Sequence, residues 1–140
     1  STGDVLDLSM RDYIIGAVTA EMPASFDEEA LKAQAVAVHT YAVRQQQAES
    51  ENPTPELCGA DLSNDSSHYQ AYFTQSQAME FYGSGYKTAY EKISSAACPI
   101  IIKISDIVPP PIGTAVTSNV AISEIPIILK TDILPTSLNK

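Results

Sequence analysis

Two spacings of apolar residues in the first half of the chain predict two kinds of element. Leu6, Asp7 and Leu8 alternate between apolar and acidic side chains after the apolar Val5, which predicts a short strand over residues 5–8. From Tyr13 onward the apolar positions follow helical spacing, and Ser9 provides an N-cap for that helix. Pro23 disfavours helical geometry in the residue before it. We therefore expect the first helix to end at about Glu21.

A second apolar stripe predicts a longer helix over residues 26–48. Its members have the i, i+4, i+7 and i+11 spacing of one helical face and are Leu31, Ala35, Val38 and Ala42. Ser25 and Glu28 have the spacing of a capping box, so we expect this helix to begin at Phe26. The many alanines beside the stripe allow another backbone to approach closely, which favours a central, buried helix.

The rest of the chain gives weaker patterns. A short amphipathic helix is expected over residues 75–82 and another helix over residues 87–97. Two isoleucine-rich runs, at 100–104 and 125–129, favour strands, and Pro126 restricts the second to a sheet edge. The predicted fold class is α+β, with two central packed helices and a small β portion. The pattern leaves the C-terminal third unassigned.

Composition limits the classes of function. The chain has 140 residues, the length of one domain, with 44% hydrophobic and 18% charged residues, as in a soluble globular protein. Its net charge of −9 argues against nucleic-acid binding and against anionic membrane surfaces. No membrane-spanning segment is expected, because no apolar run reaches about 18 residues. Two cysteines do not settle the redox compartment.

Glu21 is the strongest candidate for a catalytic residue in this sequence. The last turn of a helix carries unpaired carbonyl groups that disfavour an anion, and burial adds to this effect if Met22, Pro23 and Phe26 shield the carboxyl from water. Both effects favour the protonated form, which a general acid needs. The alternative is a solvated glutamate at a helix end.

Two long sequence motifs also resemble those of a known protein family. The run YIIGAVTAEMPASF at residues 13–26, followed by EALKAQAVAVHTYA at 29–42, resembles the signature of the stage II sporulation protein D / amidase-enhancer family. The resemblance covers about residues 5–97 and is dense up to residue 42. It implies a bacterial cell-envelope protein outside the cytoplasm. Sporulation members are lytic transglycosylases that act on peptidoglycan glycan strands, whereas amidase-enhancer members modify another wall hydrolase.

The resemblance also assigns roles to residues. Glu21 corresponds to the catalytic acid/base of the enzymes, and the expected substrate-binding residues are Ser25, Lys32, Gln34, His39, Gln70 and Tyr72. Gln70 and Tyr72 would share one face if their segment is a strand. Without the resemblance, Lys32 reads as a surface lysine, Gln34 as a hydrogen-bonded core amide and His39 as a core histidine. The family usually has arginine at position 39.

No metal or cofactor is expected. Cys58 and His68 prompt a zinc hypothesis, but two such residues without a Cys-x-x-Cys or His-x-x-x-His pair fall short of a tetrahedral site. Asp61, Asn64 and Asp65 could suggest calcium, but their segment lacks the glycine and glutamate of a calcium loop.

The domain prediction is a partial family domain over residues 1–97 and a divergent tail over 98–140. Aromatic residues stop at Tyr90 and the downstream motifs of the family are missing, so we hypothesise that the tail arose from a shifted reading frame or a broken gene. Three readings of function stay open. They are a lytic transglycosylase with Glu21 as its single acid/base, a non-catalytic amidase-enhancer or wall-binding module, and an inactive fragment.

Overall fold

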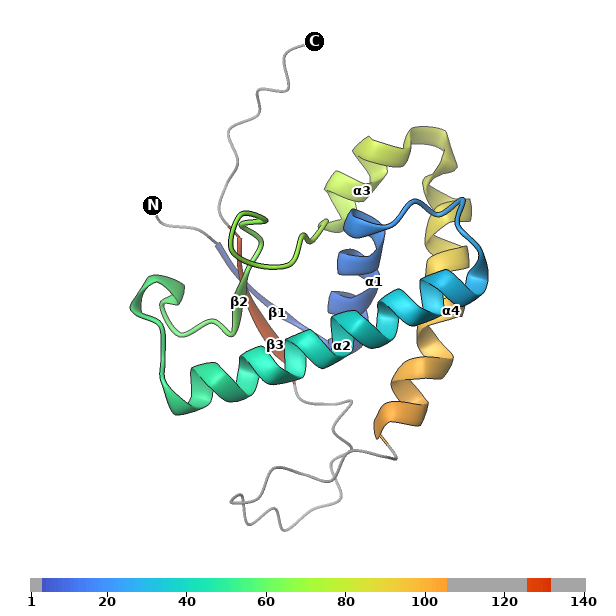
Figure 1. Cartoon of the computed structure of the whole chain (residues 1–140). Helices are drawn as coiled ribbons and strands as arrows, with labels where there is room; N and C mark the ends of the chain where they lie inside the picture. Colours follow the sequence, from blue (N-terminus) through green and yellow to red (C-terminus); the bar gives the residue numbers. More distant parts are fainter. Residues whose placement is uncertain (1–3, 106–125, 132–140) are drawn as a thin grey trace.

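A computed structural model describes residues 4–105 and 126–131, which form four α-helices and a small sheet (Figure 1). The helices are α1 (Met10–Glu21), α2 (Glu28–Glu51), α3 (Gln75–Tyr82) and α4 (Tyr86–Ser105), and the strands are β1 (Asp4–Leu8), β2 (Leu62–Ser63) and β3 (Ile127–Thr131). Two short 3-10 helices cover Pro55–Leu57 and Gly83–Gly85. The α+β prediction is confirmed.

Helix α1 has the ends that the sequence predicts. The Ser9 side chain accepts a hydrogen bond from the Asp12 N–H at 3.1 Å, which satisfies one of the unpaired donors of the first turn. At the other end Met22 is extended, as expected of a residue before proline, and its N–H donates to the Val18 carbonyl. Glu21 is therefore the last residue of the helix.

Helix α2 differs from its prediction at both ends. Its N-cap is Asp27, whose carbonyl accepts from the N–H groups of Ala30 and Leu31, so the capping box predicted from Ser25 is wrong. The Phe26 N–H instead closes a turn onto the Pro23 carbonyl at 3.1 Å, and the helix begins at Glu28 and not at Phe26. The helix continues to Glu51, beyond the predicted end at residue 48.

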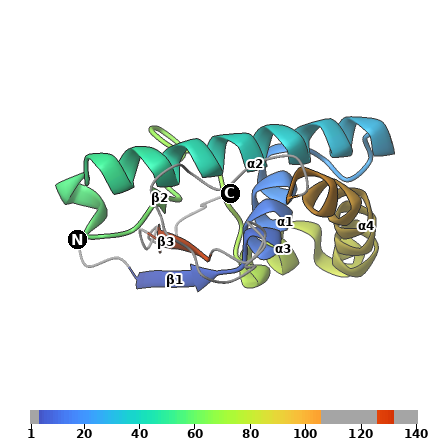
Figure 2. The same ribbon diagram turned by 90° about the horizontal axis from the view of Figure 1, so that it is seen from below.

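Helix α2 extends along one side of the molecule and joins its two halves. In Figure 2 the sheet lies beside the C-terminal half of α2, and α1 and α4 lie beside its N-terminal half. The apolar stripe of α2 faces inward, and Leu31, Ala35, Val38 and Ala42 are buried as expected. Burial of this stripe supplies most of the driving force for packing α2.

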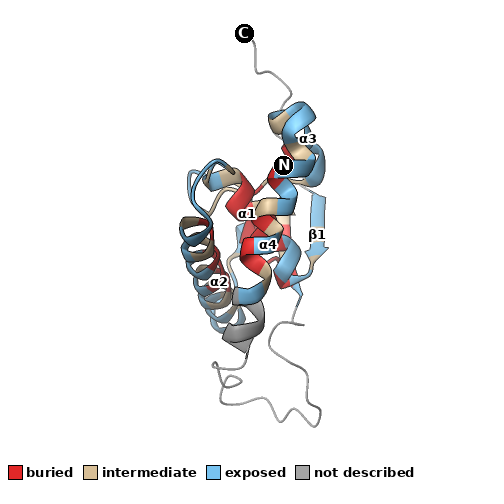
Figure 3. Cartoon of the chain, turned by 90° about the vertical axis from the view of Figure 1, so that its right-hand side faces the viewer, coloured by how far each residue is buried: buried red, intermediate tan, exposed pale blue. Residues whose placement is uncertain are grey.

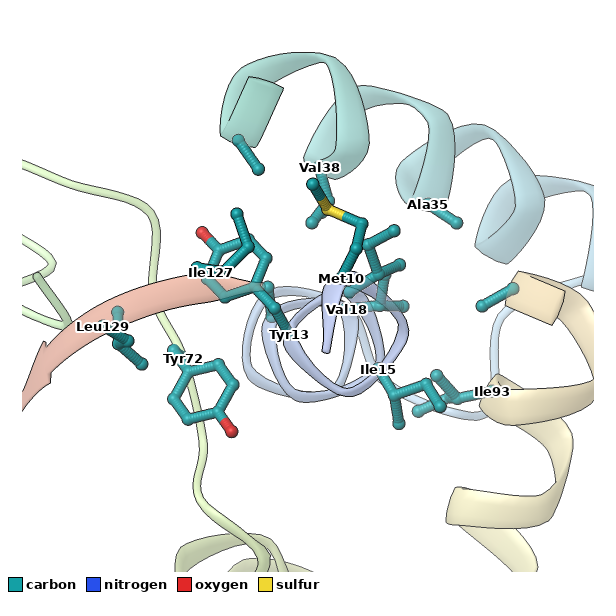
Figure 4. Close-up of a cluster of buried hydrophobic side chains, with 14 of the residues drawn as sticks. Met10, Tyr13, Ile15, Val18, Ala35, Val38, Tyr72, Ile93, Ile127 and Leu129 are labelled. Atoms are coloured by element: carbon teal, nitrogen blue, oxygen red, sulfur yellow. The ribbon is translucent and has the colours of Figure 1, made fainter. Parts of the chain in front are cut away.

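The core surrounds α1, which is covered on several sides (Figure 4). The figure shows Val18 facing α2, Ile15 facing Ile93 of α4, and Tyr13 beside Ile127 of β3. Figure 3 shows buried residues concentrated on α1 and on the inner faces of α2 and α4. The first helix is thus held rigidly, together with the glutamate at its end.

The sheet contains a strand from the C-terminal third. Its order is β1-β3-β2, with β3 antiparallel to β1 and parallel to β2. Ile127 and Leu129 of β3 are fully buried. The prediction that Pro126 restricts this strand to an edge is wrong, because the strand begins one residue later and lies in the centre.

The other isoleucine-rich run is also different from the prediction. Residues 100–104 belong to α4, which begins at Tyr86 and passes through Pro99 to Ser105. The predicted helix over residues 87–97 is therefore confirmed but longer, and the predicted strand at 100–104 is wrong. The short helix over residues 75–82 is confirmed as α3, which begins with a full capping box between Thr74 and Gln77.

Candidate active site at the end of helix α1

The elbow between α1 and α2 is fixed by contacts from two other helices. The Ala24 N–H donates to the hydroxyl of Tyr82 in α3 at 3.3 Å. The ammonium group of Lys92 in α4 donates to the Phe26 carbonyl at 2.6 Å. These bonds satisfy backbone groups that lie between the two helices, so the elbow has a defined geometry.

Glu21 projects from this elbow and stays exposed. Phe26 is 49% exposed and does not cover it, so the condition for a burial effect on the carboxyl is not met. N–H donors hold the carboxyl in its place: Gln34 Nε2 lies 2.7 Å from Oε2, and the Ala71 backbone N lies 3.3 Å from Oε1. Gln70 Nε2 approaches Oε2 at 3.5 Å.

The two glutamines suit a carboxyl group that changes its protonation state. An amide N–H donates to a carboxylate, and after rotation of the amide its carbonyl oxygen accepts from a carboxylic acid. Gln34 and Gln70 can therefore bind either form of Glu21. The Ala71 N–H can only donate, and it fixes the position of the second oxygen.

Two tyrosines stand behind this cluster. The hydroxyl of Tyr13 donates to Oε1 of Gln70 at 3.3 Å, which directs the Gln70 N–H groups toward Glu21. Burial raises the pKa of Tyr13, and the charges of Tyr41 and Glu21 add to the effect. Burial likewise raises the pKa of Tyr41, whose hydroxyl has a backbone hydrogen bond to Gln70. Both phenols stay neutral at physiological pH.

The segment from Gln70 to Phe73 reaches Glu21 because of Gly16. The Phe73 N–H donates to the Gly16 carbonyl at 3.2 Å, although that carbonyl lies within a helix. Tyr72 stacks on Tyr13 with ring centroids 5.8 Å apart and planes 3° apart. These contacts place Gln70 and Ala71 beside the end of α1.

The structure brings together some of the predicted site residues and separates others. Gln34 and Gln70 contact Glu21 directly. Lys32 is held by Glu28 and Glu29 at 2.8 Å each, and Ser25 is exposed in the turn after Pro23. The substrate-binding roles of Lys32 and Ser25 stay predictions.

Two further predicted residues lie inside the protein. His39 is only 4% exposed, and burial lowers the pKa of its imidazole, so its ring is neutral near neutral pH. Tyr72 is buried against Tyr13, and its segment is irregular, so the strand on which a shared face of Gln70 and Tyr72 depended is not present at 70–72. Sequence reasoning missed Tyr13 and the Ala71 N–H, because both act across the fold.

The structure gives no support for the zinc hypothesis on Cys58 and His68. Among the described residues no group of three or more His, Cys, Asp or Glu side chains is placed to hold a metal ion. His68 Nδ1 lies 3.0 Å from an Asp65 oxygen, whereas Cys58 is exposed and contacts the carbonyls of Pro55 and Glu56. Within the described ranges, no helix combines the length and hydropathy needed to span a membrane.

Comparison with known proteins agrees with the resemblance expected over residues 5–97. The family model described as Stage II sporulation protein matches residues 1–98. Stage II sporulation protein D of Bacillus subtilis (strain 168) is 36% identical over 92 residues, which is 66% of this chain and 26% of that protein. Its counterpart in Bacillus amyloliquefaciens is 36% identical over 96 residues, which is 69% of this chain and 27% of that protein. The chain thus spans about a quarter of the length of these relatives, and it belongs to the Stage II sporulation protein (SpoIID) family.

Proposed function

We propose that this chain carries the acid/base glutamate of a lytic transglycosylase that cleaves peptidoglycan glycan strands in the cell envelope during sporulation. The observation that supports this most is the state of Glu21. Its carboxyl is exposed to an incoming polymer, yet N–H donors from α2 and from residues 70–71 orient it. An oriented carboxyl group with open access is what acid/base catalysis on a large substrate requires.

The reaction needs only one carboxyl group. Protonated Glu21 gives its proton to the glycosidic oxygen between N-acetylmuramic acid and N-acetylglucosamine, and the bond from that oxygen to C1 breaks. The resulting carboxylate takes the proton of the muramic 6-hydroxyl, whose oxygen bonds to C1 and forms the 1,6-anhydro ring. The nucleophile belongs to the substrate, so the second carboxylate of ordinary glycosidases is unnecessary.

The neighbours of Glu21 fit both halves of that cycle. Gln34 and Gln70 donate to the carboxylate and, with their amides rotated, accept from the acid. The Tyr13 hydroxyl donates to the Gln70 amide oxygen in the first orientation and can accept from the Gln70 NH2 group in the rotated one, so this contact is compatible with both. The proton therefore leaves and returns without a large movement of the surrounding side chains.

The test is incubation of the protein with glycan strands that lack stem peptides, followed by mass spectrometry of the products. Anhydromuramyl ends are expected, and Glu21→Gln is expected to lower their rate of formation by about 10²-fold or more. Glu80→Gln is the matched control, because Glu80 is an exposed glutamate of α3 outside the cluster. Products that persist with Glu21→Gln contradict the proposal.

A second candidate is a non-catalytic module that binds wall glycans or enhances a wall amidase. Position 39 favours it, because buried, neutral His39 cannot present the planar cationic fork of an arginine. The same incubation separates the candidates. Glycan binding without anhydromuramyl products supports the module, and neither binding nor products supports an inactive fragment.

A further inference from the structure

A hollow of about 490 Å³ lies on the face of α1 opposite Glu21. The residues of α1 that line it recur at helical spacing and are Asp12, Ile15, Gly16 and Thr19. Glu21 follows Asp12 by nine residues, which at 3.6 residues per turn is about two and a half turns. The glutamate therefore points to the other side of the helix, and the hollow is a separate site.

Aromatic and aliphatic side chains form most of the walls. Beyond α1, the lining residues come from β1, the segment 72–75, α3 and α4, and are Leu6, Leu8, Tyr72, Phe73, Thr74, Gln75, Ala78, Tyr86 and Tyr90. Figure 3 shows β1, α3 and α4 around α1 on this side of the molecule. The Tyr86 and Tyr90 rings lie 5.7 Å apart, and Tyr90 is 38% exposed. The hollow thus offers several aromatic surfaces with an opening to solvent.

Of the described residues that line the hollow, only Asp12 is charged. Its Oδ2 accepts a hydrogen bond from the Ser9 hydroxyl at 2.7 Å, and none of the ion pairs between described residues involves it, so no positive charge balances it there. Its neighbour Arg11 turns its guanidinium toward the Ser94 hydroxyl, 3.4 Å away. Burial raises the pKa of Tyr72 to about 12, and the Asp12 charge adds to the effect, which places this carboxylate near an aromatic ring.

We propose that this hollow binds a lysine or arginine side chain of a partner protein. The faces of tyrosine and phenylalanine rings attract cations, and a carboxylate at the same site adds direct charge complementarity. The apolar walls from Leu6, Leu8 and Ile15 suit the methylene stem of such a side chain. The net charge of −9 favours approach of a basic partner over a long range.

The lining is less suited to a sugar. A saccharide presents many hydroxyl groups and needs several free donors and acceptors around it. The Thr19 hydroxyl already donates to the Ile15 carbonyl at 2.6 Å, and the Thr74 hydroxyl is bound in the capping box of α3. One carboxylate in a lining that is otherwise uncharged matches a single positive charge on an aliphatic stem.

The probe is the peptide acetyl-Leu-Lys-Leu-amide, titrated into the isotope-labelled chain while backbone amide signals are followed by NMR. The comparison peptide has norleucine in place of lysine, which keeps the stem and removes the charge. We expect the lysine peptide to shift the signals of residues lining the hollow and to bind at least about fivefold more tightly than the norleucine peptide. Asp12→Asn is expected to abolish that preference.

Three further variants keep the result interpretable. Asp7→Asn removes one negative charge from β1 at a position outside the lining and is expected to leave the preference unchanged. Tyr90→Leu, at an exposed position, is expected to weaken binding of the lysine peptide severalfold. Glu21→Gln is expected to leave binding of the lysine peptide unchanged, since Glu21 lies on the opposite face of α1.

The remaining outcomes overturn the proposal. Equal binding of the two peptides means an apolar groove without charge selection. A Kd above about 10 mM for the lysine peptide means that the hollow does not bind such a side chain. Shifts at the same residues caused by an N-acetylglucosamine tetramer, and not by the lysine peptide, mean a glycan site.

Discussion

Gly16 and Tyr72 lie in direct contact because position 16 has no side chain. A β-carbon there would overlap the Tyr72 ring and would lie 2.8 Å from the Phe73 carbonyl oxygen. The same glycine accepts the Phe73 N–H bond through its carbonyl. One small residue in α1 thus positions the segment that brings Gln70 and Ala71 to Glu21.

Gly16→Ala is therefore expected to reduce both stability and activity. The added methyl must push the Tyr72 segment away from α1, and overpacking of this kind costs about 1–3 kcal/mol of the free energy of unfolding. Chemical denaturation measures that loss, and the NMR signal of the Ala71 N–H reports whether its bond to Glu21 survives. Gly85→Ala is the matched control, because a β-carbon at Gly85 meets open space. Equal stabilities of the two variants would contradict the contact.

Gln34→Ala is expected to impair the reaction more than the fold. The variant removes the shortest bond to the Glu21 carboxyl, at 2.7 Å, from a partly exposed position where truncation leaves no buried cavity. Loss of an orienting bond at a reacting group lowers the rate by about 10- to 100-fold. The rate of anhydromuramyl product formation and the denaturation midpoint together check this.

Gln47→Ala provides the comparison for that variant. Gln47 lies on the same helix and bonds to Glu51 at 3.1 Å, on the exposed surface. It is expected to leave the rate unchanged. Similar rate losses in both variants would point to a general effect on α2 and not to the Glu21 cluster.

His39 predicts how stability depends on pH. Burial lowers the pKa of its imidazole in the folded protein, whereas the unfolded chain titrates near about 6.5. Below that pH the unfolded state binds more protons than the folded state, so the free energy of unfolding falls as the pH falls. The slope reaches up to about 1.4 kcal/mol per pH unit until the folded-state pKa is passed.

Substitution at His39 checks that sign. His39→Leu keeps an apolar side chain in the same place and removes the titration, so the stability curve between about pH 7 and pH 5 is expected to flatten. His68→Gln is the control, because His68 is exposed and its loss leaves the contribution of His39 intact. If the free energy of unfolding of His39→Leu still falls steeply between about pH 7 and pH 5, another group controls this pH dependence.

Local sequence signals predicted the helices well. The apolar stripe on α2 and the proline after α1 act through residues that are close in sequence, so the local sequence is enough to predict these helices. The predicted start of α2 is wrong because the Phe26 N–H closes a turn onto the Pro23 carbonyl, and Asp27, not Ser25, is the N-cap. The two candidates have similar cap preferences, and the turn between them decides.

The site was predicted only in part, because its contacts span the chain. Glu21 follows from its position before proline, but the Gln70 amide that meets it is 49 residues away. No periodicity indicates that Tyr13 would restrain that amide from the core side. The shielding considered for Glu21 is absent because Phe26 turns toward solvent and the donors come from distant segments.

The central position of β3 leads to a prediction about residues 98–140, the tail for which we hypothesised a shifted reading frame. Ile127 is fully buried in the core on one face of the sheet, whereas Ile128 points to the partly exposed face of the same strand. Ile127→Ala is expected to lower the free energy of unfolding by about 2–5 kcal/mol, and Ile128→Ala by clearly less, because only the first leaves a buried cavity. Urea denaturation measures both. Equal and small effects would mean that β3 does not hold the sheet together. A large difference means that β3 stabilises the fold whatever the origin of the tail, which sequencing of the locus decides separately.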